Sequence, residues 1–320
     1  MSIMFSGQRS SQAKKLRDTS KRITAFFCRA AKIHIEHFFF HDKGFYSAVS
    51  LLGLFFLIFI GFSFYQFFRP QFLRISFYDI GQGDAAFIET PERFQMLIDG
   101  GPDGKILEKL NRDMPFYDRT IDLIIATHPN ADHIAGLVDV LERYRVGILL
   151  LPRVENHSAV YEKLLREAQK ENVPIRELWG IEDMIIDKNI DFKILNPLRG
   201  QKYENDNDFG IAGLLTYNRF RSLFTADISK SIEEKIVKFL PKSITILKVA
   251  HHGSRYSSSF NFLKSIHPKL SVISVGKNHY GHPAIETLQN LASVGTSIWR
   301  TDENKDLRII SDGETYWIGN

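Results

Sequence analysis

The 320-residue sequence has a single cysteine, Cys28, and it shows no internal repeat or low-complexity linker. One cysteine cannot form an internal disulfide, so a disulfide-stapled scaffold is excluded and cysteine usage does not indicate a compartment. Glycine and proline are also modest, at 21 and 11 residues, which excludes a collagen-like chain. Apolar residues make up 44% and charged residues 24%. This balance is typical of a globular protein that buries a core, not of a disordered chain.

Charge is absent from one 21-residue stretch, residues 48–68. About 20 apolar residues span the hydrocarbon core of a bilayer as a helix, so we expect a single transmembrane helix over this stretch. A buried core helix is the alternative, but soluble helices of this length usually keep a polar face.

The residues before this stretch are basic. Residues 1–45 hold nine Lys/Arg against three Asp/Glu, a net charge of +6, whereas the whole chain carries only +4, so the remainder sums to −2. The positive-inside rule then places a basic N-terminal segment, residues 1–47, in the cytoplasm and residues 71–320 outside it. The sequence therefore predicts a single-pass protein of the cell membrane with an extracytoplasmic domain.

After Pro70, short β-rich runs alternate with helical runs. Strands are expected over residues 73–79, 85–89, 95–99, 121–126, 146–151, 192–195, 212–217, 221–225, 244–249, 270–275, 297–300 and 307–310. Helices are expected over residues 105–113, 133–144, 158–171, 229–240, 258–267 and 285–294. About 250 residues in this order suit one α/β domain, in which two mixed sheets pack together with helices outside.

Acidic and imidazole side chains follow several of these strands, at the point where each strand ends. If the strand ends share one edge of the sandwich, these side chains converge. Imidazole and carboxylate ligands together suit zinc, iron or manganese, so the pattern predicts a metal site. Asp99 has an alternative interpretation, because an Asp before Gly-Gly is also an ordinary turn residue. The residues are Asp99, His128, Asp132, His133, Asp227, His251 and His252.

With these motifs in combination, the chain resembles the metallo-β-lactamase fold and, more narrowly, the soluble domain of ComEC-type competence proteins. The resemblance covers about residues 72–311. It implies an αββα sandwich, a site for one or two divalent metals (zinc or manganese), and hydrolysis of phosphodiesters in a nucleic acid such as DNA. The matching segments are residues 77–85, 127–133, 226–227, 248–254, 274–278 and 281–283.

The resemblance also implies a role for each matching ligand. His128 would bind a first metal, and Asp132 and His133 would bind a second. Asp227 would bridge the two metals, and His252 would complete the second site.

The same resemblance implies the catalytic residues. Asp132 is one of them, in addition to being a metal ligand. His251 would face the substrate and protonate the leaving oxygen. Lys277 and His282 are candidates to clamp the phosphate. A solvated surface lysine and a structural histidine in a Gly-His-Pro turn are the alternatives for these two.

The signature is broken at one position. The family has His or Asp where this chain has Asn130, and an amide oxygen is a neutral, weak ligand. A further ligand is poorly matched by residues 205–208, whose role stays unassigned. The sequence thus predicts one strong and one doubtful metal site. It also leaves a second hypothesis open, namely a catalytically weakened binding module that keeps the fold at the membrane surface.

Charge within the domain supports a polyanionic substrate. Residues 248–300 hold six Lys/Arg against Glu286 alone, a net charge of +5, so a basic face near the metal is expected. Scattered surface charges are the alternative. Aromatic residues in this segment are few, so no stacking platform for single strands is evident.

Overall fold

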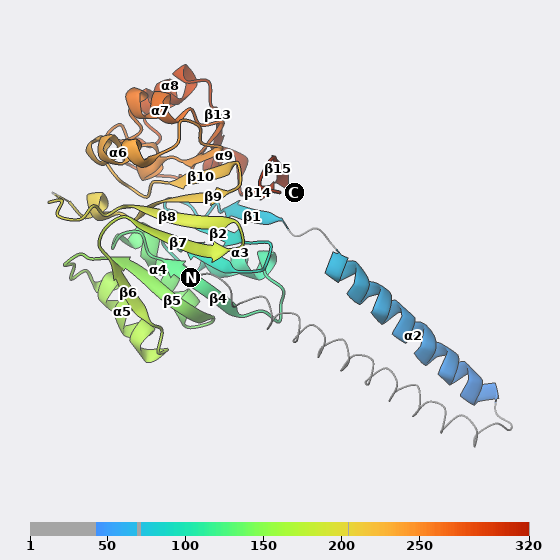
Figure 1. The fold of residues 1–320 in the computed structure, drawn as a ribbon. Helices are drawn as coiled ribbons and strands as arrows, with labels where there is room; N and C mark the ends of the chain where they lie inside the picture. Colours follow the sequence, from blue (N-terminus) through green and yellow to red (C-terminus); the bar gives the residue numbers. More distant parts are fainter. Residues whose placement is uncertain (1–42, 69–71, 204, 320) are drawn as a thin grey trace, which may run out of the picture. The chain divides into compact units, whose positions relative to one another are not determined.

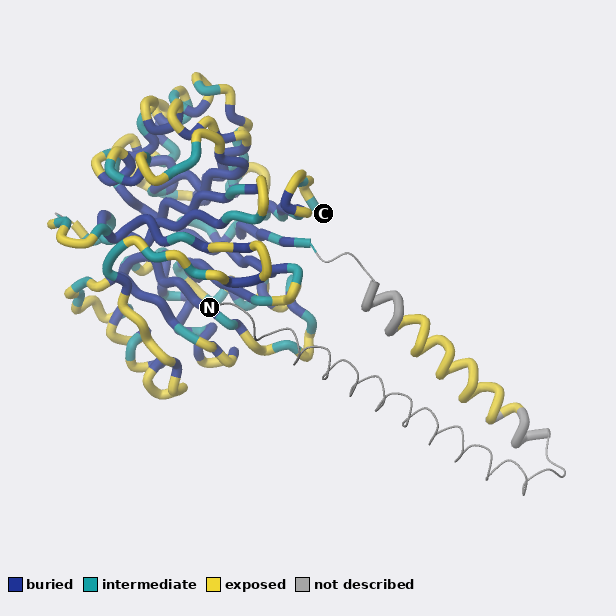
Figure 2. The backbone as a smooth tube through the Cα atoms, viewed as in Figure 1, coloured by how far each residue is buried: buried dark blue, intermediate teal, exposed yellow. Residues whose placement is uncertain are grey.

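The computed structural model describes residues 43–68, 72–203 and 205–319, and residues 1–42 of the basic segment lie outside this range. The chain divides near residue 70 into two units. The first unit contains helix α2 (Lys43–Phe68). Its side chains are described at position 47 and over 49–62, where large apolar residues are exposed (Figure 2). Among the described residues, no helix is both long and apolar enough to cross a membrane.

The second unit contains two mixed sheets (Figure 1). The first sheet has eight strands in the order β15-β14-β1-β2-β3-β4-β5-β6, and the second has seven in the order β13-β12-β11-β10-β9-β8-β7. The strands of the first sheet are β1 (Leu73–Phe77), β2 (Ala86–Glu89), β3 (Gln95–Ile98), β4 (Thr120–Ile125), β5 (Arg145–Pro152), β6 (Ile175–Leu178), β14 (Leu307–Ser311) and β15 (Tyr316–Gly319). Those of the second are β7 (Glu182–Asp187), β8 (Ile190–Asn196), β9 (Ala212–Tyr217), β10 (Phe220–Phe224), β11 (Ile246–Lys248), β12 (Leu270–Ile273) and β13 (Ser297–Arg300).

Short helices complete the unit. The α-helices are α3 (Lys105–Asp113), α4 (Ala131–Leu141), α5 (Ala159–Lys170), α6 (Lys230–Ile236), α7 (Phe260–Ile266), α8 (Ile285–Ser293) and α9 (Thr301–Asn304). The 3-10 turns are η1 (Asp206–Phe209), η2 (Val237–Phe239) and η3 (Ala250–Gly253).

Strand alternation builds three apolar layers. Along β4, Leu123 and Ile125 point into the core between the sheets, whereas Ile124 points to the opposite face. That outer face of the first sheet is covered by α3, α4 and α5, and the outer face of the second sheet by α6, α7 and α8. The result is a two-sheet sandwich with helices outside, as the sequence predicts.

Every strand expected from the sequence is present, with bounds shifted by at most two residues. Three strands were not predicted, namely β6, β7 and β15, and each lies at an edge of its sheet. An edge strand covers less core, so its apolar pattern is weak; in β6 three of four residues are exposed. The predicted helix 229–240 divides into α6 and η2, and the helix predicted from His133 begins two residues earlier, at Ala131.

Candidate metal centre

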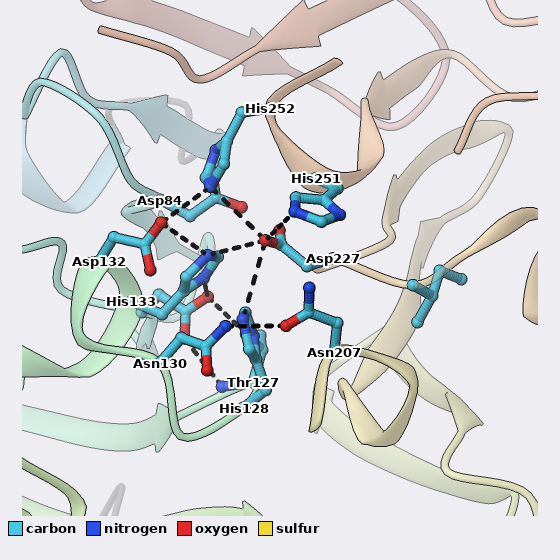
Figure 3. A network of polar contacts seen from close by, with 12 residues as sticks. Asp84, Thr127, His128, Asn130, Asp132, His133, Asn207, Asp227, His251 and His252 are labelled. Atoms are coloured by element: carbon cyan, nitrogen blue, oxygen red, sulfur yellow. Dashed lines mark hydrogen bonds and ion pairs between the residues drawn. The ribbon is translucent and has the colours of Figure 1, made fainter. Parts of the chain in front are cut away.

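The residues of the candidate centre follow the carboxyl ends of four strands (Figure 3). In the first sheet, β3 leads into Asp99 and β4 into His128, after which Asp132 and His133 lie in the first turn of α4. In the second sheet, β10 leads into Asp227, and β11 into the η3 histidines. The sandwich therefore brings residues from both sheets to one edge, as expected from their positions after strands.

Three imidazoles are held by their Nδ1 atoms. His252 Nδ1 lies 2.9 Å from the carbonyl oxygen of Ser274, which can only accept, so Nδ1 carries the proton. His133 Nδ1 lies 2.8 Å from Asp99 Oδ2 in the same way. His128 Nδ1 lies 3.0 Å from the hydroxyl oxygen of Thr127, whose own proton goes to Asp99. Each ring therefore presents Nε2 to the interior of the site, the arrangement expected of metal-ligating histidines.

The Nε2 atoms converge on one carboxylate. Asp227 is 3% exposed, and its Oδ2 is approached by four imidazoles at distances too long for good hydrogen bonds. The Nε2–Oδ2 distances are 3.8 Å from His128, 3.5 Å from His133, 3.8 Å from His251 and 3.6 Å from His252.

Several of these buried atoms have no hydrogen-bond partner among the described residues, namely His128 Nε2, His133 Nε2 and Asp227 Oδ1. Buried polar atoms are normally paired, so unpaired nitrogen and oxygen atoms gathered at one place fit the ligands of a cation. Four residues offer ligand atoms that all lie within 4.8 Å of one another, namely Asp84, His133, Asp227 and His252. The residues present therefore fit a divalent metal.

Electrostatics at the centre favour positive charge. Burial raises the pKa of Asp227, but His252 and His133 lower it well below the usual range. Burial lowers the pKa of His252, yet Asp227 and Asp84 raise it to about 10. When no metal is bound, protons on the histidines thus supply the positive charge, and a bound metal would replace them. His128 differs, because burial and His133 lower its pKa to about 3.

Asp84 reaches the centre from the loop between β1 and β2, and the sequence analysis gave it no role. Its Oδ2 pairs with buried Lys248 at 2.7 Å, and its Oδ1 lies 3.3 Å from His252 Nδ1. Asp132 lies on the opposite side of that ring, with Oδ2 3.2 Å from Nε2. The signal for Asp84 was its place in the Gly-Gln-Gly-Asp segment. A Cβ at Gly83 would fall 2.1 Å from the Asp132 carbonyl oxygen, so this close approach requires glycine.

The backbone at the centre is strained. Asp99, Ala226, His251 and His252 all have positive φ, between 46° and 57°. Such conformations cost about 1–3 kcal/mol each in non-glycine residues and concentrate at functional sites. The surrounding sheets hold these residues in place.

Two groups of side chains lie around Asp227. The carboxylate side comprises Asp132, His133 and His252. The amide side comprises His128, Asn130 and Asn207. Asn130 Nδ2 donates to Asn207 Oδ1 at 2.8 Å, so two neutral amides bond to each other there. Asn207 belongs to η1, within the stretch 205–208 whose role the sequence left unassigned.

The centre opens into a cavity of about 640 Å³, lined by His251, Lys277 and His282 as well as by Asp227. His251 has 29% of its side chain exposed, so it faces this cavity more than His252 does, at 2%. Burial, His251 and His252 lower the pKa of His282 to about 4. Of the two predicted phosphate-clamp residues, Lys277 therefore supplies the positive charge and His282 a neutral imidazole.

The predicted basic face is smaller than the sequence indicated. Lys248 is buried against Asp84, and Arg300 pairs with Asp302 and Glu303. A charge count over one segment omitted these partners, which come from outside it.

A two-sheet αββα sandwich with imidazoles and carboxylates at one edge defines a class of metal-centred proteins. The sequence model of the metallo-beta-lactamase superfamily matches residues 78–277, and this chain belongs to that superfamily. The predicted resemblance to competence proteins is also confirmed.

Two relatives illustrate this. ComE operon protein 3 of Bacillus subtilis is 29% identical over 250 residues, which cover 72% of this chain and 32% of that protein. Recombination protein 2 of Haemophilus influenzae is 24% identical over 263 residues, covering 80% and 31%. This chain thus spans about a third of the length of these relatives. Among solved structures, the diiron β-hydroxylase CmlA of Streptomyces venezuelae shares the fold, with a TM-score of 0.50, 14% identity, and coverage of 76% and 54%.

Proposed function

We propose that this chain is a membrane-anchored, metal-dependent hydrolase that cleaves phosphodiester bonds in nucleic acid. The observation that carries the proposal is the convergence of four imidazole Nε2 atoms on Asp227, in a centre that opens into a cavity. The family consists largely of metal-dependent hydrolases. The names of the relatives, a competence protein and a recombination protein among them, favour DNA as the substrate.

In this proposal the carboxylate side holds the metal together with Asp227. Asp132 is preferred to Asp84 as the ligand, because Lys248 already neutralises Asp84, which lies beside the protonated Nδ1 of His252. Nitrogen and oxygen ligands of this kind suit zinc or manganese. The amide side offers neutral oxygens, so any second metal would bind there weakly.

A bound divalent metal supplies a Lewis acid for the phosphoryl oxygens and a water of lowered pKa. The chain's own residues bind the phosphate and transfer the proton. Lys277 binds the phosphate by charge at the cavity wall, and His282 adds a neutral hydrogen-bonding group. His251 holds a proton at Nε2 and delivers it to the leaving oxygen.

The test is metal analysis of the full chain in detergent, purified without chelator, followed by hydrolysis of bis-p-nitrophenyl phosphate. We expect about one metal per chain and turnover that is lost on chelation and restored by manganese or zinc. A chain that binds neither metal in excess would refute the enzyme proposal.

A second candidate function is a binding module that keeps the fold but turns over nothing. The Asn130–Asn207 amide pair favours it, because one of the two metal positions lacks charged ligands. The same assay separates the two candidates, since a binding module would hold metal without hydrolysing the phosphodiester.

Membrane anchoring is proposed from the sequence around α2. The uncharged run 48–68 lies within this 26-residue helix and extends beyond the part whose side chains are described. The +6 segment before it favours a cytoplasmic N-terminus and an extracytoplasmic hydrolase domain. A reporter fused after Asn320 should be active outside the cytoplasm, and deletion of residues 1–70 should release a soluble domain. Cytoplasmic activity of the reporter, or a deletion product that stays in the membrane fraction, would contradict this.

A further inference from the structure

The loop from Lys277 to Pro283 forms one wall of the cavity above the metal centre. Lys277, His279 and Tyr280 are exposed and line the same cavity as Asp227 and His251. Tyr280 is 74% exposed. The exposed Tyr280 ring takes little part in the core, and it lies at the rim of the cavity that opens from the metal centre.

The loop is held in one shape by a single side chain. The Asn278 amide nitrogen donates to the carbonyl oxygens of Gly276 and His282, both at 2.8 Å. Its oxygen accepts from the backbone N–H groups of Tyr280 and His282, both at 3.1 Å. The backbone that carries the Tyr280 ring is therefore fixed, which reduces the entropy lost when a ligand binds there.

A row of rings leads from this residue to the centre. The Tyr280 and His282 rings lie 5.8 Å apart with their planes inclined by 32°, and the His282 and His251 rings lie 5.4 Å apart. One cation lies beside the row, because Lys277 lines the same cavity wall.

We propose that Tyr280 is a stacking site for a base of single-stranded nucleic acid, whose phosphodiester lies between the metal centre and Lys277. This rests on the proposed function and specifies its substrate. A flat aromatic surface beside a cationic, metal-centred phosphate site matches the two parts of a nucleotide, an aromatic base and a phosphate. Bases are free to stack on a protein ring only when they are not stacked in a duplex, which selects a single strand.

The kinetic test compares two esters that share a leaving group, thymidine 5′-(p-nitrophenyl phosphate) and methyl p-nitrophenyl phosphate, with the full chain in detergent and manganese. Tyr280→Ala should lower kcat/KM for the thymidine ester about tenfold, the loss expected for one base–aromatic stack. It should leave the methyl ester within about twofold. Tyr280→Phe should preserve both values, because it keeps the ring.

Tyr117→Ala is the matched control, since Tyr117 is 73% exposed and does not line the cavity. It should change neither ester. An equal loss for both esters in Tyr280→Ala, or no loss for either, would overturn the stacking proposal.

A binding test examines the stacking proposal independently of the proposed hydrolase function. If the wild-type chain hydrolyses neither ester, the proposed hydrolase function fails, but fluorescence anisotropy with labelled (dT)12 still measures stacking. Tyr280→Ala should then weaken binding of (dT)12 about tenfold relative to wild type and to Tyr117→Ala. Binding of a 12-base-pair duplex as tight as that of (dT)12, or (dT)12 binding unaffected by Tyr280→Ala, would refute the site.

Discussion

Asp227 separates two groups of side chains that differ in charge and in how they are held. On the carboxylate side, Asp132 carries a negative charge, and the rings of His133 and His252 are each fixed by a strong acceptor, the carboxylate of Asp99 and the carbonyl of Ser274. On the amide side, His128 is fixed by the hydroxyl of Thr127, and the neighbouring Asn130 bonds to Asn207 instead of offering charge.

The difference shows that one edge of the sandwich can hold two groups of polar side chains of which only one carries charged residues besides Asp227. Both sides take residues from the turn after β4, so position after that strand does not distinguish them. The residue types do, since charged and oriented ligands hold a cation more tightly than a neutral amide that competes with water. We therefore expect one strong metal position on the carboxylate side.

Loss of Asp227 should have the largest effect, because its Oδ2 faces the imidazoles of both sides. Asp227→Ala should reduce bound metal to near zero and lower phosphodiesterase activity by at least about 100-fold, measured by elemental analysis and turnover of the full chain. Asp191→Ala, an exposed carboxylate on β8, is the control. Full metal content in a folded Asp227→Ala chain would remove this residue from the centre.

The next largest effects should come from the two adjacent histidines, and these should differ from each other. His252→Ala should empty the carboxylate side, because its buried ring is fixed with Nε2 beside Asp132. His251→Ala should keep the metal and slow turnover by about 100-fold or more, as for loss of a general acid. Metal analysis and kinetics on both variants check this. If His251→Ala loses the metal and His252→Ala keeps it, the two roles are exchanged.

Asp99→Asn tests how the carboxylate side is held. The backbone N–H of Thr127 can still donate to the side-chain oxygen of the variant, but the new amide presents a donor to His133 Nδ1. The ring then shifts its proton to Nε2, which can no longer bind a metal. We expect metal affinity to fall about 10–100-fold while the fold survives, measured by metal titration and circular dichroism. An unchanged affinity would mean that His133 does not depend on Asp99.

Asn130→Asp should have the smallest effect on the metal that is already bound. It tests whether the lack of a charged residue explains the difference between the two sides. A carboxylate beside His128 and Asp227 gives the amide side a charged ligand, so metal content should rise from about one toward two per chain. Asn207→Asp is the matched test from the other member of the pair. A wild-type chain that already binds two metals tightly would show that the amides are sufficient ligands.

The sequence predicted twelve of the strands, because buried strands carry apolar runs, and it placed acids and imidazoles directly after several of them. It did not predict β6, β7 or β15, whose edge positions leave much of their surface in water. It gave Asp84 no role, because the Gly-Gln-Gly-Asp segment alone does not show that this loop meets Lys248 and His252. The role proposed for Tyr280 was not predicted either, because nothing local distinguishes a ring at a cavity rim from an ordinary loop residue.

Residue type and order by themselves determined that this chain has apolar strands followed by acidic and imidazole side chains, an uncharged run after a basic segment, and a neutral amide, Asn130, between His128 and His133. Only the tertiary structure decided which side chains meet. Asp132 and His252 are 120 positions apart, and Lys248 reaches Asp84 from the other sheet. Such contacts depend on how two sheets pack and on strained turns that hold the rings, and these are properties of the folded core that no local sequence pattern carries.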